Sequence, residues 1–136
     1  MNSIEKGEIL HNNHNISPEL LKKVYSLCFE YAVSLLGKKK SGELLYSSYH
    51  TILPYFQTLE KFVPDAHWEL DIRIESLSEK ELLAFTVWIQ QFVRELKNFV
   101  VGLGSFNITH LTGEVKEELE QIGFYEYYRQ AEELKY

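Results

Sequence analysis

Apolar side chains recur at alternating intervals of three and four positions through most of the chain, which is the spacing of one face of an α-helix. The first such segment begins at Ser17, where a hydroxyl, a following proline and Glu19 are typical of a helix start. It extends to about Leu36, and Gly37 is expected to end it in a left-handed conformation. The pattern therefore predicts a helix over residues 17–36, followed by a basic loop at Lys38–Lys40.

A second apolar seam, which begins at Leu45, predicts a helix over residues 43–63. Pro54 falls inside this segment. Because a proline removes one backbone hydrogen bond and crowds the preceding turn, we expect a kink or a break near residues 49–53.

The longest seam runs from Leu82 to Leu103 and follows Ser78 and Glu81, which have the spacing of a capping box. Trp88 and its neighbours make the first half of this segment apolar on nearly all sides. We therefore expect the central helix of the domain here, ended by the glycines at positions 102 and 104.

Residues 68–75 follow a different pattern, in which apolar and charged side chains alternate. A period of two predicts a half-buried strand, with Trp68, Leu70, Ile72 and Ile74 on its buried face. The backbone of a strand needs a partner, and the candidates within the chain are residues 4–10 and 105–111. Failing these, the strand would pair with its copy in a second subunit.

Two shorter helices are predicted over residues 114–122 and 124–134, separated by Gly123. The predicted fold class is therefore mostly α: a bundle of four to five helices with one short amphipathic strand or minor hairpin. Residues 1–16, rich in Asn and His, are expected to form a flexible N-terminal arm, and residues 17–136 a single helical domain.

Length and charge narrow the class of function. The 136 residues suffice for one domain with a sizeable core. The chain has 20 Asp and Glu and 14 Lys and Arg, which gives a net charge of −6. This charge argues against binding to nucleic acid or to a membrane, and it favours a basic protein partner. The single cysteine, Cys28, lies in an apolar segment, which predicts a buried, unreactive thiol and a reduced, cytoplasmic setting.

Residue types that carry catalysis do not form a convincing arrangement. His11 and His14 lie on the Asn-rich arm, where a metal role has little support. Ser105 lacks the glycine spacing of a nucleophile elbow, and the nearby glycines end a helix instead of opening one around a phosphate. We therefore expect no catalytic residue, no metal and no cofactor, and we favour a protein that is not an enzyme over a small enzyme whose site is assembled across a dimer interface.

His50 is the one histidine with a functional interpretation. It lies away from the apolar seam and one turn before Pro54, and a proline-induced break in a helix often borders a pocket. His50, Tyr49 and Arg94 are therefore the candidate ligand-binding residues of a sensor that holds a small apolar or haem-like ligand between the second and third helices.

Tyrosine is concentrated at the C-terminus, with four in the last 12 residues. A large apolar face with a polar tip suits a surface that a partner covers, so Tyr125, Tyr127 and Tyr128, together with Ile72 of the strand, are the candidate partner contacts. The leading hypothesis is a non-enzymatic cytoplasmic interaction or regulatory protein (an adaptor, a regulator or an immunity-type inhibitor) that acts as a homodimer. The ligand-binding sensor is the alternative.

Overall fold

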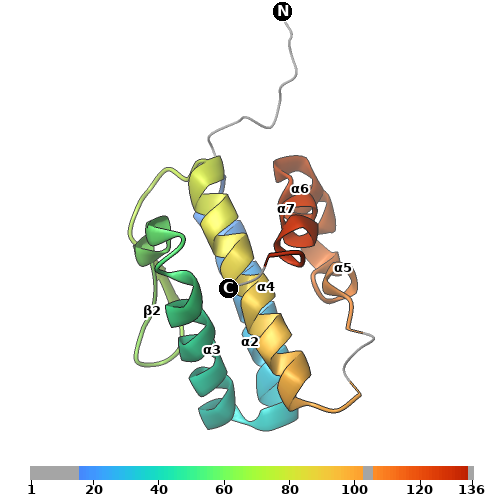
Figure 1. The fold of residues 1–136 in the computed structure, drawn as a ribbon. Helices are drawn as coiled ribbons and strands as arrows, with labels where there is room; N and C mark the ends of the chain where they lie inside the picture. The colour runs from blue at the N-terminus through green and yellow to red at the C-terminus, as the bar shows by residue number, and fades with distance from the viewer. Residues whose placement is uncertain (1–15, 103–105, 135–136) are drawn as a thin grey trace, which may run out of the picture.

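The middle of the computed structural model is helix α4 (Glu79–Phe99), which runs between two groups of elements (Figure 1). The structure describes residues 16–102 and 106–134. Helix α2 (Pro18–Leu36) packs against α4 and against α3. On one side of α4 lie α3 (Lys38–Ile52) and the strands β2 (Phe62–Pro64) and β3 (Leu70–Ile72), and on the other side lie α5 (Ile108–Leu111), α6 (Lys116–Ile122) and α7 (Phe124–Ala131).

The predicted fold class is confirmed: the chain is a mostly α bundle with a minor hairpin. The described ranges hold six α-helices, where four to five were expected, because α5 is an extra helix of only four residues. Within the same ranges, none of the helices combines the length and the apolarity that crossing a membrane requires.

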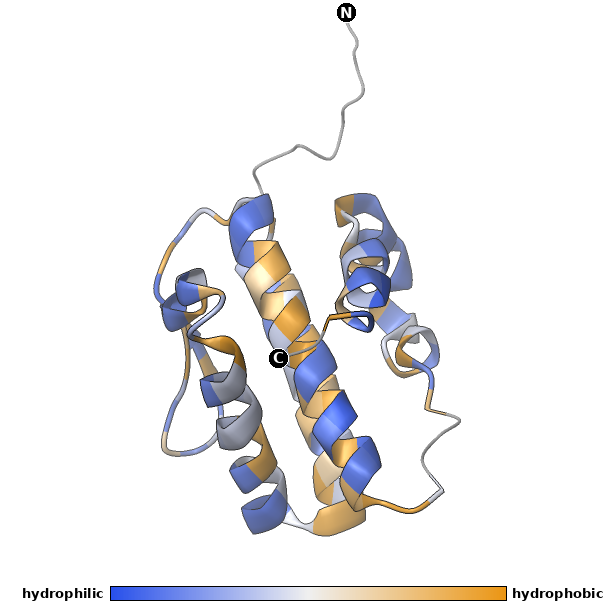
Figure 2. Ribbon diagram, viewed as in Figure 1, coloured by the Kyte–Doolittle hydropathy of each residue, from blue (hydrophilic) through white to orange (hydrophobic). Residues whose placement is uncertain are grey.

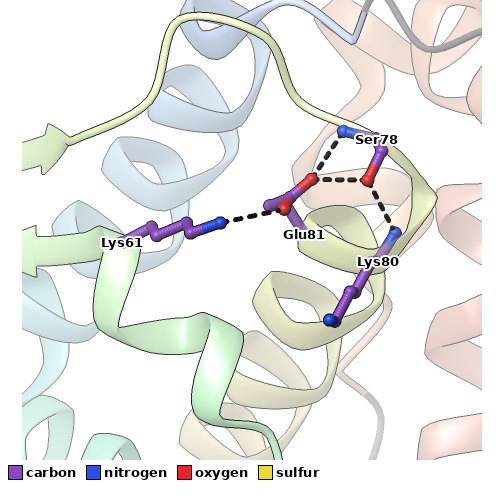
Figure 3. Close-up of polar contacts among 4 residues, drawn as sticks. All are labelled: Lys61, Ser78, Lys80 and Glu81. Carbon is purple, nitrogen blue, oxygen red and sulfur yellow. Dashed lines mark hydrogen bonds and ion pairs between the residues drawn. The ribbon is translucent and has the colours of Figure 1, made fainter.

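The capping box at the start of α4 forms as predicted (Figure 3). The amide and the hydroxyl of Ser78 both donate to Glu81 Oε1, at 2.7 and 2.6 Å, and the amide of Lys80 donates to Ser78 Oγ. These bonds satisfy amides that the first turn of a helix leaves free. Much of α4 is hydrophobic, as Figure 2 shows, and its first half includes the fully buried Trp88, so α4 is the central helix that the pattern predicted.

Gly37 ends α2 and also precedes α3. Its φ of 85° favours glycine, and its amide donates to the Val33 carbonyl at 2.8 Å. Helix α3 begins directly afterwards, so the predicted loop at Lys38–Lys40 is instead the first turn of a helix. Cations are unfavourable at a helix N-terminus, but Lys40 Nζ lies 3.4 Å from a Glu43 carboxylate oxygen and 4.2 Å from the Phe99 ring centroid, which offsets part of that cost.

The break expected near residues 49–53 is confirmed, since α3 ends at Ile52. The prediction of a helix as far as residue 63 is wrong, because the chain turns at Pro54 and continues as a 3₁₀ helix, η1 (Gln57–Lys61), into β2. Leu59 is nevertheless fully buried, as its place in the apolar seam required.

The strand predicted over residues 68–75 is shorter than expected, and its partner is a different segment. β3 pairs antiparallel with β2, with Phe62 opposite Ile72 and Pro64 opposite Leu70. Of the two expected partners, residues 105–111 do not serve, because α5 occupies residues 108–111, and residues 4–10 lie outside the described ranges. Pairing with a second subunit is not needed to provide the strand with a partner.

At the C-terminal end, Gly123 separates α6 from α7 as predicted, and it does so in a left-handed conformation with φ 87° and ψ 16°. Before α6 the segment Gly113–Val115 forms a 3₁₀ turn. Ile16, the first of the described residues, is buried, and its amide donates to the Leu77 carbonyl at 3.3 Å. The rest of the arm, including His11 and His14, lies outside the described residues.

Candidate functional site

The loop between β2 and β3, residues 65–69, is fixed in place by the side chain of Asp65. Its Oδ1 atom accepts hydrogen bonds from the amides of His67 (2.7 Å) and Glu69 (3.0 Å). The Asp65 amide in turn donates to the Glu69 carbonyl at 2.8 Å. The amides of Glu69 and His67 hold the pKa of the Asp65 carboxyl below its usual range, so the carboxylate is charged at neutral pH. An aspartate that bonds to backbone amides ahead of it is a common device for shaping a turn.

Trp68 attaches this loop to the helices. It is the one residue other than glycine with a positive φ (65°) among the described residues, so the surrounding contacts must hold its backbone in place. Its carbonyl accepts a hydrogen bond of 2.7 Å from the Tyr25 hydroxyl of α2, and its ring lies 5.9 Å from that of Phe29. The ring also lies directly on Gly42 of α3, where a Cβ atom would come within 2.4 Å of Trp68 Cζ2.

An open cavity of about 420 Å³ lies between α3 and the hairpin. Tyr46, Tyr49 and His50 line it from α3, where positions three and four apart share a face of the helix. Residues 63–66 and Trp68 line it from the hairpin. We call this cavity the aromatic recess.

The rings of the aromatic recess contact one another. The Tyr46 and His50 ring centroids are 4.2 Å apart, and Tyr49 meets His50 edge-on at 5.6 Å. The Tyr49 hydroxyl donates to the Leu59 carbonyl at 3.0 Å, which fixes its ring beneath η1. Tyr46 is 63% exposed at the rim. Two of the three predicted ligand-binding residues, His50 and Tyr49, therefore do come together beside a cavity, although it lies between a helix and a hairpin and not between two helices.

A second cavity, of about 530 Å³, lies on the other side of Trp68 against α2. Its lining mixes charges of both signs, with Lys22 and Lys38 beside Glu30 and Glu69. We call it the mixed-charge pocket. Trp68 lines both cavities.

Arg94, the third predicted ligand-binding residue, is engaged elsewhere. Its guanidinium donates to the carbonyls of Ala131, Glu132 and Leu134, at 3.0–3.3 Å. These carbonyls belong to the last residue of α7 and to the segment directly after it, where a helix leaves acceptors without partners. Arg94 therefore fastens the end of α7 to α4 and does not join His50.

The predicted partner contacts at the C-terminus largely serve the interior. Tyr128 is only 5% exposed and packs against Phe124, and its burial raises the pKa of its hydroxyl. The Tyr125 hydroxyl lies 2.6 Å from Thr112 Oγ1, and Tyr127 is half-buried. Ile72, half-buried in β3, packs against the core opposite Phe62. The Tyr128 ring is therefore not accessible to a partner, because it packs α7 against the core.

The base of the hairpin is tied to α4 by Lys61, whose Nζ lies 3.5 Å from Glu81 Oε2 (Figure 3). The Glu81 side chain is only 7% exposed. Burial raises its pKa, but the bonds from Ser78 and the charge of Lys61 outweigh this effect, and the net result is a lowered pKa. One carboxylate thus both caps α4 and positions the strand that leads into the aromatic recess.

Other chemistry is sparse in the part of the chain that the structure describes. No group of three or more His, Cys, Asp or Glu side chains there has the geometry to hold a metal ion. Cys28 is buried, and burial raises the pKa of its thiol to about 12, which makes it an unreactive core residue as predicted.

Sequence analysis missed three residues of the site: Tyr46, Asp65 and Trp68. Tyr46 was detectable, because it precedes His50 by one helical turn on the same exposed side. Asp65, directly after a proline, is a recognisable turn former. Trp68 carried no local signal, since its alternation with charged residues indicated a strand and not a loop.

Comparison of the chain with models of known families, with curated proteins and with solved structures found no match.

Proposed function

We propose that the protein is a non-enzymatic binding module of adaptor or regulator type, which docks a protein partner on the face formed by α3 and the hairpin. The observation that carries the proposal is the aromatic recess, an open cavity lined by Tyr46, Tyr49, His50 and Trp68. Tyrosine and tryptophan dominate the energetics of protein interfaces, because they bring large contact areas with few rotatable bonds.

The recess is already built before any partner arrives. The Asp65 turn, the Tyr25 hydrogen bond and the contact with Gly42 hold the loop in one conformation. A preorganised site does not lose the free energy that ordering a loop costs on binding, about 0.5–1.5 kcal/mol for each side chain that must be immobilised. This rigidity supports a binding surface that a partner recognises as it stands.

The openness of the recess favours a protein partner over a small molecule. Sites for small molecules enclose most of the ligand surface. Here Tyr46 stands exposed at the rim, while the space between α3 and α4 is filled by Leu45, Ile52 and Trp88. The alternative, a sensor for a small apolar or haem-like ligand, would use the same recess, because His50 and Tyr49 line it.

A capture experiment with matched variants tests the proposal. Tagged wild-type protein, Tyr46→Ala and Tyr55→Ala are used to capture partners from the cells that produce the protein, and the captured proteins are compared by quantitative mass spectrometry. Tyr55 is a matched control, because it is 62% exposed but lines a different cavity, beside Pro54. We expect a partner that wild type and Tyr55→Ala retain and Tyr46→Ala loses.

Equal capture by all three proteins would contradict docking at the recess, and a catalytic turnover by the purified protein would contradict the non-enzymatic role. Native mass spectrometry of the same sample separates the alternatives. A retained ligand that disappears on denaturation would favour the sensor, and a species of twice the chain mass would favour the homodimer that the sequence suggested.

A further inference from the structure

The two cavities beside Trp68 differ in charge, and this difference indicates what the aromatic recess binds. The mixed-charge pocket presents Lys22 and Lys38 as well as Glu30 and Glu69. Among the described residues that line the aromatic recess, neither Lys nor Arg occurs, and Asp65 is the one acidic side chain. A cation in the recess is therefore attracted by one lining carboxylate and repelled by no lining Lys or Arg, while Arg73 lies close enough to act on the Tyr49 hydroxyl from outside.

The aromatic lining adds to this preference. The faces of Tyr and Trp rings carry a negative quadrupole, so a cation within about 6 Å of the ring centroid is attracted to them. Tyr46, Tyr49 and Trp68 supply three such rings around one cavity. The exposed rim also lets a charged group enter without losing all of its hydration.

Asp65 is arranged to meet a cation. Both loop amides donate to Oδ1, which leaves Oδ2 without a hydrogen-bond partner within the described ranges. An apolar side chain placed next to this carboxylate would remove water from it without supplying a hydrogen bond in exchange. A cationic side chain replaces that water with a charge-assisted hydrogen bond.

We infer that the aromatic recess takes an arginine side chain of a basic partner protein, with the guanidinium against the Tyr46 and Trp68 rings and paired with Asp65. Guanidinium is flat, stacks on aromatic rings and is weakly hydrated, whereas the lysine ammonium keeps its water more strongly. The net charge of −6 favours a basic partner over an acidic one. This inference rests on the proposed function and names the chemistry of its partner.

The test is a titration of the full chain, labelled with ¹⁵N, with peptides of the form acetyl-Gly-Gly-X-Gly-Gly-amide, in which X is arginine, citrulline, lysine or leucine. Citrulline has the shape of arginine without its charge. We expect the arginine peptide to shift the amide signals of Ala66 and the indole signal of Trp68 with a dissociation constant in the millimolar range. The citrulline and leucine peptides should bind about tenfold more weakly, and the lysine peptide should fall between them.

Paired variants identify the groups responsible. Asp65→Asn keeps a side-chain carbonyl that can accept the two loop amides but removes the charge, and we expect it to weaken arginine binding about threefold. Glu118→Gln removes an equal charge from an exposed carboxylate of α6, on the opposite side of α4 from the recess, and it should leave binding unchanged. Tyr46→Ala should weaken binding, and Tyr55→Ala should not.

The outcomes separate this inference from the proposed function. If citrulline or leucine peptides shift the same signals as strongly as arginine, the recess receives side chains but is not selective for cations, and the inference alone is overturned. If none of the four peptides shifts them, the recess receives no side chain, and the docking site of the proposed function is overturned as well. Equal weakening by Asp65→Asn and Glu118→Gln would show that only the overall charge matters, which also overturns the inference.

Discussion

Trp88 and Trp68 lie in two regions of the molecule that are built differently. Trp88 is fully buried in α4, and its ring N–H donates to Ser48 Oγ at 3.2 Å. Trp68 is half-buried in a short loop with a positive φ and borders two open cavities. Both rings have aromatic neighbours, so aromatic packing alone does not distinguish a core residue from a surface one.

The two regions are joined by shared tyrosines. Tyr25 packs against Trp88 with its ring and holds the Trp68 carbonyl with its hydroxyl. Tyr49 meets Trp88 edge-on at 5.2 Å and lines the aromatic recess as well. The recess is therefore built directly on the core, and its walls gain the rigidity of a close-packed interior. A small surface site can thus be rigid without a disulfide or a metal when core residues form its floor.

The largest effect on stability is expected in the core, at Trp88. Trp88→Ala should lower the free energy of unfolding by about 3–5 kcal/mol, because it removes a large, fully buried side chain and leaves a cavity. Trp68→Ala should cost clearly less, since its ring is only half-buried. Urea denaturation followed by far-UV circular dichroism measures both. Equal losses of unfolding free energy in the two variants would show that the loop belongs to the cooperative core and that the two regions are not built differently.

The contact between Gly42 and Trp68 gives a second test, in which the effect of one substitution on stability should change sign. Gly42→Ala alone should destabilise the protein by about 1 kcal/mol, because the new methyl group collides with the Trp68 ring and overpacking outweighs the gain in helix propensity. In a Trp68→Ala background the collision is gone, and the same change should stabilise the protein by up to about 1 kcal/mol.

Urea denaturation of the two single variants and the double variant measures the resulting coupling, about 2 kcal/mol. Gly113→Ala is a useful control, because no atom lies within 4 Å of the Cβ it would add. Additive effects of the substitutions at positions 42 and 68 would mean that the ring does not seat on α3 in solution.

Local signals predicted the core region well. Ser78 and Glu81 fix the start of α4 by hydrogen bonds between residues three apart, and Gly37 and Gly123 end helices by their own backbone conformation. Such interactions are complete within one turn of chain, so the sequence contains all of their parts.

The region around the aromatic recess was harder to predict, because its contacts join distant segments. β2 is three residues long and ends in a proline, so it carries no alternating pattern that would identify it as the partner of β3. The contact between Trp68 and Gly42 joins positions 26 residues apart, and the sequence near either residue does not indicate that the two meet. The sequence therefore indicated His50 and Tyr49, which lie one turn before the break at Pro54, but not the hairpin residues that complete the recess.

The smallest expected effect concerns the loop turn and its dependence on pH. The amides of Glu69 and His67 lower the pKa of Asp65 in the folded state relative to the unfolded chain, whose value is about 4. A lowered carboxyl pKa contributes stability that is present above the unfolded value and is lost as the pH falls through the folded value. Wild type should therefore be slightly more stable than Asp65→Asn at pH 7, and the difference should shrink as the pH falls below about 4.

Urea denaturation of both proteins at a series of pH values measures this difference. Glu81 also has a lowered pKa and loses stability in the same direction, but it is present in both proteins and cancels in the comparison. A difference that stays constant down to low pH would mean that the Asp65 carboxylate is not held by the loop amides in solution. The carboxylate would still be charged at neutral pH, but the loop would not hold that charge at a fixed position beside the aromatic recess.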